Sequence, residues 1–441
     1  MRKTIFLAML AVLPHAARAQ DTPPVALSLA RAVAVAADTA PAVRIAELRT
    51  AEAQARVAQA RGSLLPSVSA AAGVVDQTRN RNTFGISFPS APGTTTPDRI
   101  GPYDVYDARV RVAAPVYDPA GIARVRVQRA AVAGSEAERA AAAEGARQRA
   151  ALAYVRAERA QAAVSARMED VRLAEELVEL ARAQLDRGVA AGIDVVRAQT
   201  QVAAARGLLS VARNQAAQAQ VELARALGVD PATRFALTDT LATDGVHPGA
   251  PAADAAVETA LARRPELQAE EARLRAAQAG SRALWAERLP RVDVLADYGY
   301  SGVQPTDGIA TYQVGVQVSV PVWDGNRRGA REAEQSAVAA EAGVRSADVR
   351  GQVAAEVRSA LLDVSSAGEQ TEIAADRLRL AQEELSQARE RFANGIAGNI
   401  EVINAQQSLV RARDAVIDAG FATAAARVAL ARATGTTDTL R

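Results

Sequence analysis

The chain has 441 residues, no cysteine, and 52 lysines and arginines against 50 aspartates and glutamates. Three of the basic residues lie within positions 1–19, so the rest of the chain carries 49 basic and 50 acidic side chains, with no basic excess for nucleic acid. The missing cysteine excludes disulfide bonds and thiolate metal sites.

The first residues have the three parts of a secretory signal peptide. Arg2 and Lys3 form a charged start, residues 4–13 an apolar stretch, and Ala-Arg-Ala at 17–19 a cleavage site. The apolar stretch is too short for a bilayer span, which needs about 20 residues. We therefore expect residues 1–19 to be removed from an exported protein, which is not lipidated because no cysteine follows the cleavage site.

A long segment of the sequence occurs twice. AQLDRGVAAGIDVVRAQTQV at 183–202 matches ARERFANGIAGNIEVINAQQSL at 388–409. One constant offset pairs Gly188 with Gly395, Asp194 with Glu401, and Gln199 with Gln406. Such duplication predicts a tandem repeat. We assign residues 20–240 to repeat one, 241–251 to a linker, and 252–441 to repeat two.

Each repeat begins with alanine-rich helices and continues into two strands. A proline divides the helices, Pro41 in repeat one and Pro265 in repeat two. The second helix is expected over 42–64 in repeat one and over 266–289 in repeat two. Each ends at a Leu-Pro pair, because proline cannot continue a helix. Alternating polar and apolar residues then predict half-buried strands. Their expected bounds are about 66–76 and 105–117 in repeat one, and about 290–300 and 311–323 in repeat two.

The predicted strands have one polar and one apolar face. The polar faces supply the candidates for a channel lumen: Arg109, Arg111, Asp293, Asp297, Gln313 and Gln317. Six of the seven tyrosines lie in or beside the strands, as in the aromatic belt of a membrane protein. Ordinary β-propensity would also place tyrosines there, and a sheet that faces water would show the same alternation.

Two very long helical runs follow the strand pairs, over about 119–185 and 326–392, each roughly 100 Å long at 1.5 Å per residue. Helices of this length need partners. In repeat two the apolar residues recur at the 4-3 spacing of a coiled-coil seam, at Ala374, Leu378, Ala381, Leu385, Ala388 and Phe392. Glycines allow the chain to reverse, so the hairpin tips are predicted at Gly188, Gly192, Gly395 and Gly398.

Four strands are too few to close a barrel, because known single-chain barrels start at eight. An open sheet edge is not tolerated in lipid. If the strands span a membrane, several chains must therefore share one barrel. Its lumen would be lined by the polar strand faces and extended by the helical hairpins.

The chain resembles the TolC family of outer membrane efflux and secretion ducts over essentially all of its mature length. The resemblance rests on the tandem repeat, the Leu-Pro strand starts, the Pro-Val-Tyr-Asp and Pro-Val-Trp-Asp strand ends at 115–118 and 321–324, and the hairpin tips. It implies a mainly α protomer with a small β part, whose hairpins form an α-barrel. It also implies a homotrimer with a shared 12-stranded β-barrel in outer membrane lipid.

The resemblance further implies a duct without a cofactor. A periplasmic adaptor, which links it to an inner-membrane transporter, would dock on the hairpin tips and open an aperture that is closed at rest. The periplasmic gate would comprise Glu401, Asp194, Asn404 and Phe392. Glu401 occupies the place of a constricting acid, and Asn404 replaces a second acid. Phe392 has no hydroxyl for the family's latch to Asp194, and Ala397 replaces the arginine of a second latch.

The residues alone leave other roles open for two of these positions. Glu401 equally suits a solvated acid in the first turn of a helix. Asp194 equally suits a cap for a helix that begins near Val195.

Other functions have weaker support. An enzyme is not expected, since the mature chain has one histidine, His247, and no nucleophile or phosphate-loop motif. A periplasmic coiled-coil adaptor would usually carry one hairpin beside compact β-domains, and a purely structural coiled coil leaves the strands unexplained. A type I protein secretion duct remains the alternative to drug or metal efflux.

Overall fold

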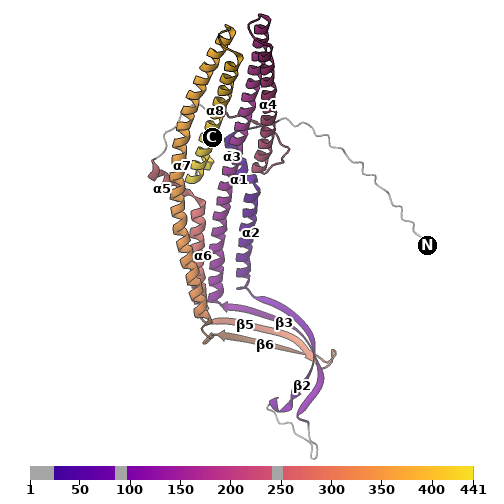
Figure 1. Ribbon diagram of the computed structural model, residues 1–441. Coiled ribbons are helices and arrows are strands. Elements are labelled where there is room, and N and C mark those ends of the chain that lie inside the picture. The colour runs from indigo at the N-terminus through magenta and orange to yellow at the C-terminus, as the bar shows by residue number, and fades with distance from the viewer. Residues whose placement is uncertain (1–23, 85–96, 241–251, 441) are drawn as a thin grey trace, which may run out of the picture.

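A computed structural model describes residues 24–84, 97–240 and 252–440. The expected signal peptide and the linker 241–251 lie outside the described residues. The molecule is elongated: long helices run side by side, and a sheet projects from one end of them (Figure 1). Within these residues, no helix combines the length and the apolar character needed to cross a membrane.

The two repeats share the order helix, helix, strand, strand, helix, helix, and among the described residues repeat one has two additional short strands, β1 and β4. Repeat one comprises β1 (Val25–Leu27), α1 (Leu29–Thr39), α2 (Pro41–Gly62), β2 (Ser67–Asn80), β3 (Arg99–Tyr117), α3 (Pro119–Asp186), α4 (Gly192–Leu227) and β4 (Phe235–Leu237). Repeat two comprises α5 (Ala253–Arg263), α6 (Pro265–Ala286), β5 (Arg291–Gly302), β6 (Ile309–Ser319), α7 (Arg327–Ala393) and α8 (Asn399–Thr434). Short 3-10 helices follow β2 (Arg81–Phe84) and α8 (Thr437–Thr439).

Helix starts follow the expected chemistry. Pro119 is the first residue of α3, and the Asp118 carboxylate accepts a 2.7 Å hydrogen bond from the Gly121 N–H. Helix α2 ends at Gly62 and α6 at Ala286, two and three residues earlier than predicted. The chain tightens there into i→i+3 hydrogen bonds, such as Leu289 N–H to the Ala286 carbonyl, before each proline.

The sheet has the order β2-β3-β5-β6 and is antiparallel throughout. Its middle pair, β3 and β5, joins the two repeats, while β2 and β6 are its edges. Strand β2 reaches Asn80, beyond the expected 76, whereas β6 ends at Ser319 instead of 323. Pro321 has no N–H to continue the ladder, and Trp323 is exposed.

The helical hairpins pack through small side chains. Helix α3 packs along α4, α7 along α8, and α3 also along α8. The largest buried cluster lies near the hairpin tips and combines both repeats, with Leu177 and Ala198 from one and Phe392 and Val402 from the other. The two hairpins of one chain therefore share a core near their tips.

Candidate functional site

Positive backbone φ angles mark both hairpin tips. Gly188 has φ 74° and Gly395 φ 71°, a region that favours glycine. Each donates its N–H to a carbonyl of the preceding helix, Leu185 or Phe392. Gly192 begins α4 and Gly398 precedes α8, and neither has a positive φ, so these two positions do not require glycine.

Buried amide side chains bind the two tips together. Gln184 Nε2 of α3 donates to the Ala393 carbonyl at 2.8 Å, and Asn399 Nδ2 of α8 donates to the Asp194 carbonyl at 2.7 Å. These side chains are 2% and 1% exposed. Sequence reasoning missed both residues, because their partners are backbone carbonyls of the other hairpin.

Phe392 belongs to the shared core near the tips and is buried, as its place in the 4-3 seam predicts. Its side chain packs in that core. Asn404, by contrast, is exposed on α8.

Asp194 lies inside α4, which begins at Gly192 and not near Val195. Its carboxylate accepts from the Ala191 N–H at 3.2 Å and lies 3.6 Å from an Arg197 guanidinium nitrogen. Asp194 is therefore the third residue of α4 and caps the helix from that position. It is not the N-cap residue that precedes the helix. That arrangement satisfies an N–H that would otherwise lack a helical partner.

Glu401 lies in the first turn of α8 and has a charged partner. Its Oε1 is 3.1 Å from Nε of Arg391, near the end of α7. Sequence reasoning missed this arginine, because the pair depends on the path of the turn between α7 and α8.

The strand register places all six lumen candidates on one face of the sheet. Arg111 is paired with Asp297, which is paired with Gln313, while Asp293 is paired with Gln317. Arg109 donates to Asp297 at 2.5 Å, across from β3 to β5.

The opposite face of the sheet is apolar and exposed. Tyr298, Tyr312 and Val110 lie in one row across three strands. Val316 of β6 keeps 69% of its surface exposed. Within the described residues, no other part of the chain covers these side chains.

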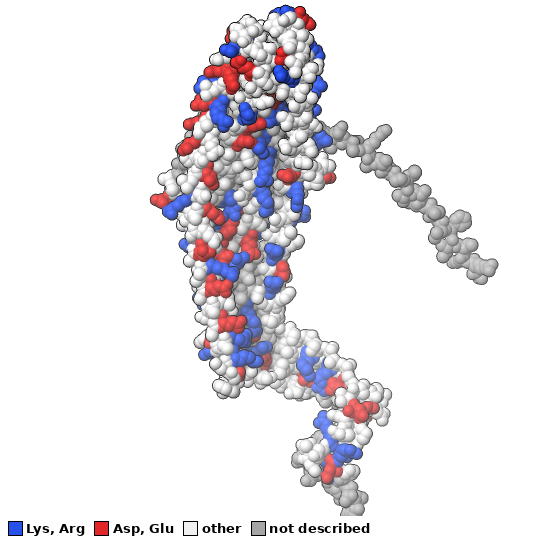
Figure 2. Space-filling view, in the orientation of Figure 1, with Lys and Arg blue, Asp and Glu red and all other residues white. Residues whose placement is uncertain are grey.

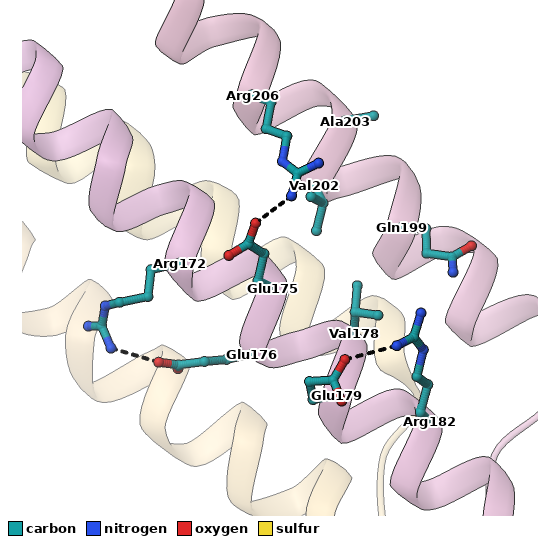
Figure 3. A pocket seen from close by; sticks show the side chains of 10 residues that line it. All are labelled: Arg172, Glu175, Glu176, Val178, Glu179, Arg182, Gln199, Val202, Ala203 and Arg206. Atoms are coloured by element: carbon teal, nitrogen blue, oxygen red, sulfur yellow. Dashed lines mark hydrogen bonds and ion pairs between the residues drawn. The ribbon is translucent and has the colours of Figure 1, made fainter.

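A groove of about 800 Å³ lies between α3 and α4, toward the tip of the first hairpin. Figure 3 shows Val178 and Val202 between charged side chains. Arg206 contacts Glu175 at 2.7 Å across the groove, and Arg182 contacts Glu179 at 3.0 Å. The groove combines an apolar base with charges of both signs.

Over the helical part of the molecule, basic and acidic side chains are intermingled on the face seen in Figure 2. In the described ranges, no group of His, Cys, Asp and Glu side chains is arranged to hold a metal ion.

One buried carboxyl lies far from the tips, where α3 passes β1 and β4. Burial raises the pKa of Glu158 to about 7, and the negative charge of Asp239 adds to that effect. Nearby, the Tyr154 hydroxyl donates to the Leu27 carbonyl at 2.9 Å and contacts Asp239 Oδ2 at 3.1 Å. Burial raises the pKa of Tyr154 to about 12, so it remains a donor.

Comparison with known proteins gives one consistent result. The sequence pattern of the family described as outer membrane efflux protein matches residues 32–229 and 256–436. The outer membrane efflux protein BepC of Brucella suis is 26% identical over 274 residues, which are 61% of this chain and 58% of that relative.

Solved structures of outer membrane proteins share the fold. VceC of Vibrio cholerae is 19% identical with a TM-score of 0.73, and the match covers 92% of this chain and 96% of VceC. The outer membrane channel MtrE of Neisseria gonorrhoeae, in an open state, is 18% identical with a TM-score of 0.69, over 92% and 88% of the two chains. At these identities the likeness concerns the fold alone.

Proposed function

The chain belongs to the outer membrane efflux protein family, and we propose that three copies of it form a passive duct that carries solutes from the periplasm to the cell exterior. The sheet would lie in the outer membrane and the helical hairpins in the periplasm. An inner-membrane transporter would select and drive the cargo, and a periplasmic adaptor would connect the two.

The observation that carries this proposal is the exposed apolar face of the four-stranded sheet. Residues of β6 that point to this face, such as Tyr312 and Val316, are mostly exposed. A soluble monomer rarely leaves so continuous an apolar surface in water. The other face carries Arg109, Arg111 and Asp297. One face therefore suits lipid and the other suits a water-filled lumen.

The edges of the chain support a ring. Among the described residues, strands β2 and β6 are the two edges of the sheet. The helices α7, α8, α3 and α4 follow one another across the molecule (Figure 1), so that α7 and α4 are its flanks. Exposed apolar residues occur on both flanks, with Leu208 and Val211 on α4 and Leu362 and Leu380 on α7. Head-to-tail contact between unlike edges closes a ring when the rotation fits.

The proposed aperture and docking surfaces lie at the hairpin tips. Glu401 would face the axis of the ring, and an adaptor would contact the turns at Gly188 and Gly395. The groove between α3 and α4 supports this assignment, because it offers both apolar surface and charge to a second helical protein.

Fractionation and conductance test the proposed function. The full chain should be recovered with the outer membrane, run as a trimer in mild detergent, and form ion-conducting pores in planar bilayers. Recovery as a monomer from the periplasm, or a trimer that never conducts, would contradict it.

A further inference from the structure

The second hairpin has an ion pair across its turn. Arg391 lies near the end of α7 and Glu401 in the first turn of α8, separated by the turn at 394–398. The Arg391 Nε atom is 3.1 Å from the Glu401 Oε1 atom. The side chains are 53% and 44% exposed, so both remain in contact with solvent.

The first hairpin lacks this pair. The offset that relates Gly188 to Gly395 also relates Gln184 to Arg391. Gln184 is neutral and points to the second hairpin, where it donates to the Ala393 carbonyl. The two tips therefore differ in charge at these equivalent positions. Only in repeat two does this position carry a guanidinium that pairs with the acid at the start of the following helix.

We propose that Arg391 determines ion selectivity by neutralising Glu401 in each protomer. This inference rests on the proposed function, which puts Glu401 at the aperture. A carboxylate paired with a guanidinium acts on a passing ion as a dipole, whose field falls off faster than that of a single charge. The aperture therefore discriminates weakly between cations and anions, even though it contains an acid from every protomer.

A purely structural role makes a different prediction. Arginine near a helix C-terminus and glutamate near a helix N-terminus both suit the helix dipoles, so the pair could simply support the hairpin. A half-exposed ion pair contributes little to folding. Variants of either residue should therefore assemble, and the two roles are separated by ion selectivity instead of stability.

Reversal potentials across planar bilayers, measured in dilute salt with the full-length trimer, test the proposal. We expect Arg391→Gln to raise the cation-to-anion permeability ratio about three- to tenfold, because three uncompensated carboxylates act together and screening extends over about 10 Å at 0.1 M salt. Divalent cations should then block the pore. Glu401→Gln should shift the ratio toward anions by a similar factor.

Two further variants separate charge from structure. The double variant Arg391→Gln/Glu401→Gln should return to the wild-type ratio, and Arg391→Lys should keep it, since both preserve a neutral pair. Arg345→Gln is the matched control. It breaks an exposed ion pair with Glu341 on the same helix α7, far from the tip, and should leave the ratio unchanged.

The outcomes distinguish this inference from the function on which it rests. If Glu401→Gln shifts the ratio but Arg391→Gln does not, the aperture assignment stands and the role of Arg391 is overturned. If neither substitution shifts the ratio, Glu401 does not face the aperture, and both the aperture assignment and the role of Arg391 are overturned. A wild-type trimer that forms no pore would overturn the proposed function itself, and this inference with it.

Discussion

Removing the Asn399 side chain amide should loosen the contact between the two hairpin tips. Asn399 is 1% exposed, and its Nδ2 donates to the Asp194 carbonyl at 2.7 Å. Asn399→Ala removes this hydrogen bond, but the carbonyl lies in α4 and keeps its helical donor, so the loss is that of one typical hydrogen bond, about 0.5–1.5 kcal/mol. Among the described residues, the Asn399 Oδ1 atom is itself buried without a hydrogen-bond partner. Deleting it offsets part of the loss, and we expect a net destabilisation of about 0.5–1 kcal/mol.

Hydrogen exchange of the tip amides measures this effect directly. Since 1.4 kcal/mol corresponds to a tenfold change in an equilibrium constant, local opening should become about 2- to 5-fold more frequent. Asn404→Ala is the matched control, because it removes the same side chain from an exposed position of the same helix. Equal exchange in the two variants would refute the assignment of Asn399 as a bond between the hairpins.

Two other positions give independent predictions. The pKa of Glu158 is raised in the folded chain. Its contribution to the free energy of unfolding is therefore fully present below about pH 4.5 and is lost as pH rises through about 7. Glu158→Gln should therefore raise the unfolding temperature at pH 8 and change it little at pH 4, and an equal effect at both pH values would contradict burial of the charge as the cause. Gly395→Ala should destabilise the second tip by about 1 kcal/mol, because φ is positive and the new Cβ would lie 3.0 Å from Val189 Cγ1. Gly398→Ala, with open space around it, is the control in thermal unfolding of the same trimer, and equal losses would remove the conformational argument.

Period-two alternation predicted the faces of the sheet correctly. Arg111, Asp297 and Gln313 come from three strands, yet the antiparallel register puts them in one row. A strand has only two faces, so the pattern leaves little freedom. The strand ends were less predictable, as at Ser319, because they depend on where the last hydrogen bond of the ladder forms.

The contacts at the tips could be predicted only in part. The repeated glycines marked both turns, and the 4-3 spacing already put Phe392 in the core. The partners of Gln184 and Asn399, however, are backbone carbonyls of the other hairpin. A carbonyl has no signature in the sequence, so these bonds follow only from how the hairpins pack. The Arg391–Glu401 pair depends in the same way on the path of the turn.

Cross-linking between chains tests the proposed ring most directly. The chain has no cysteine, so single thiols can be introduced without removing any. Leu208 on α4 and Leu380 on α7 lie at similar depths from the tips, about 24 and 20 Å at 1.5 Å per residue, and each is about half exposed. In the double variant Leu208→Cys/Leu380→Cys, a short bismaleimide applied to outer membranes should give covalent dimers and trimers. Pairing Leu208→Cys with Val344→Cys, much farther along α7, should give none, and monomers alone from the first pair would contradict a head-to-tail ring of three chains.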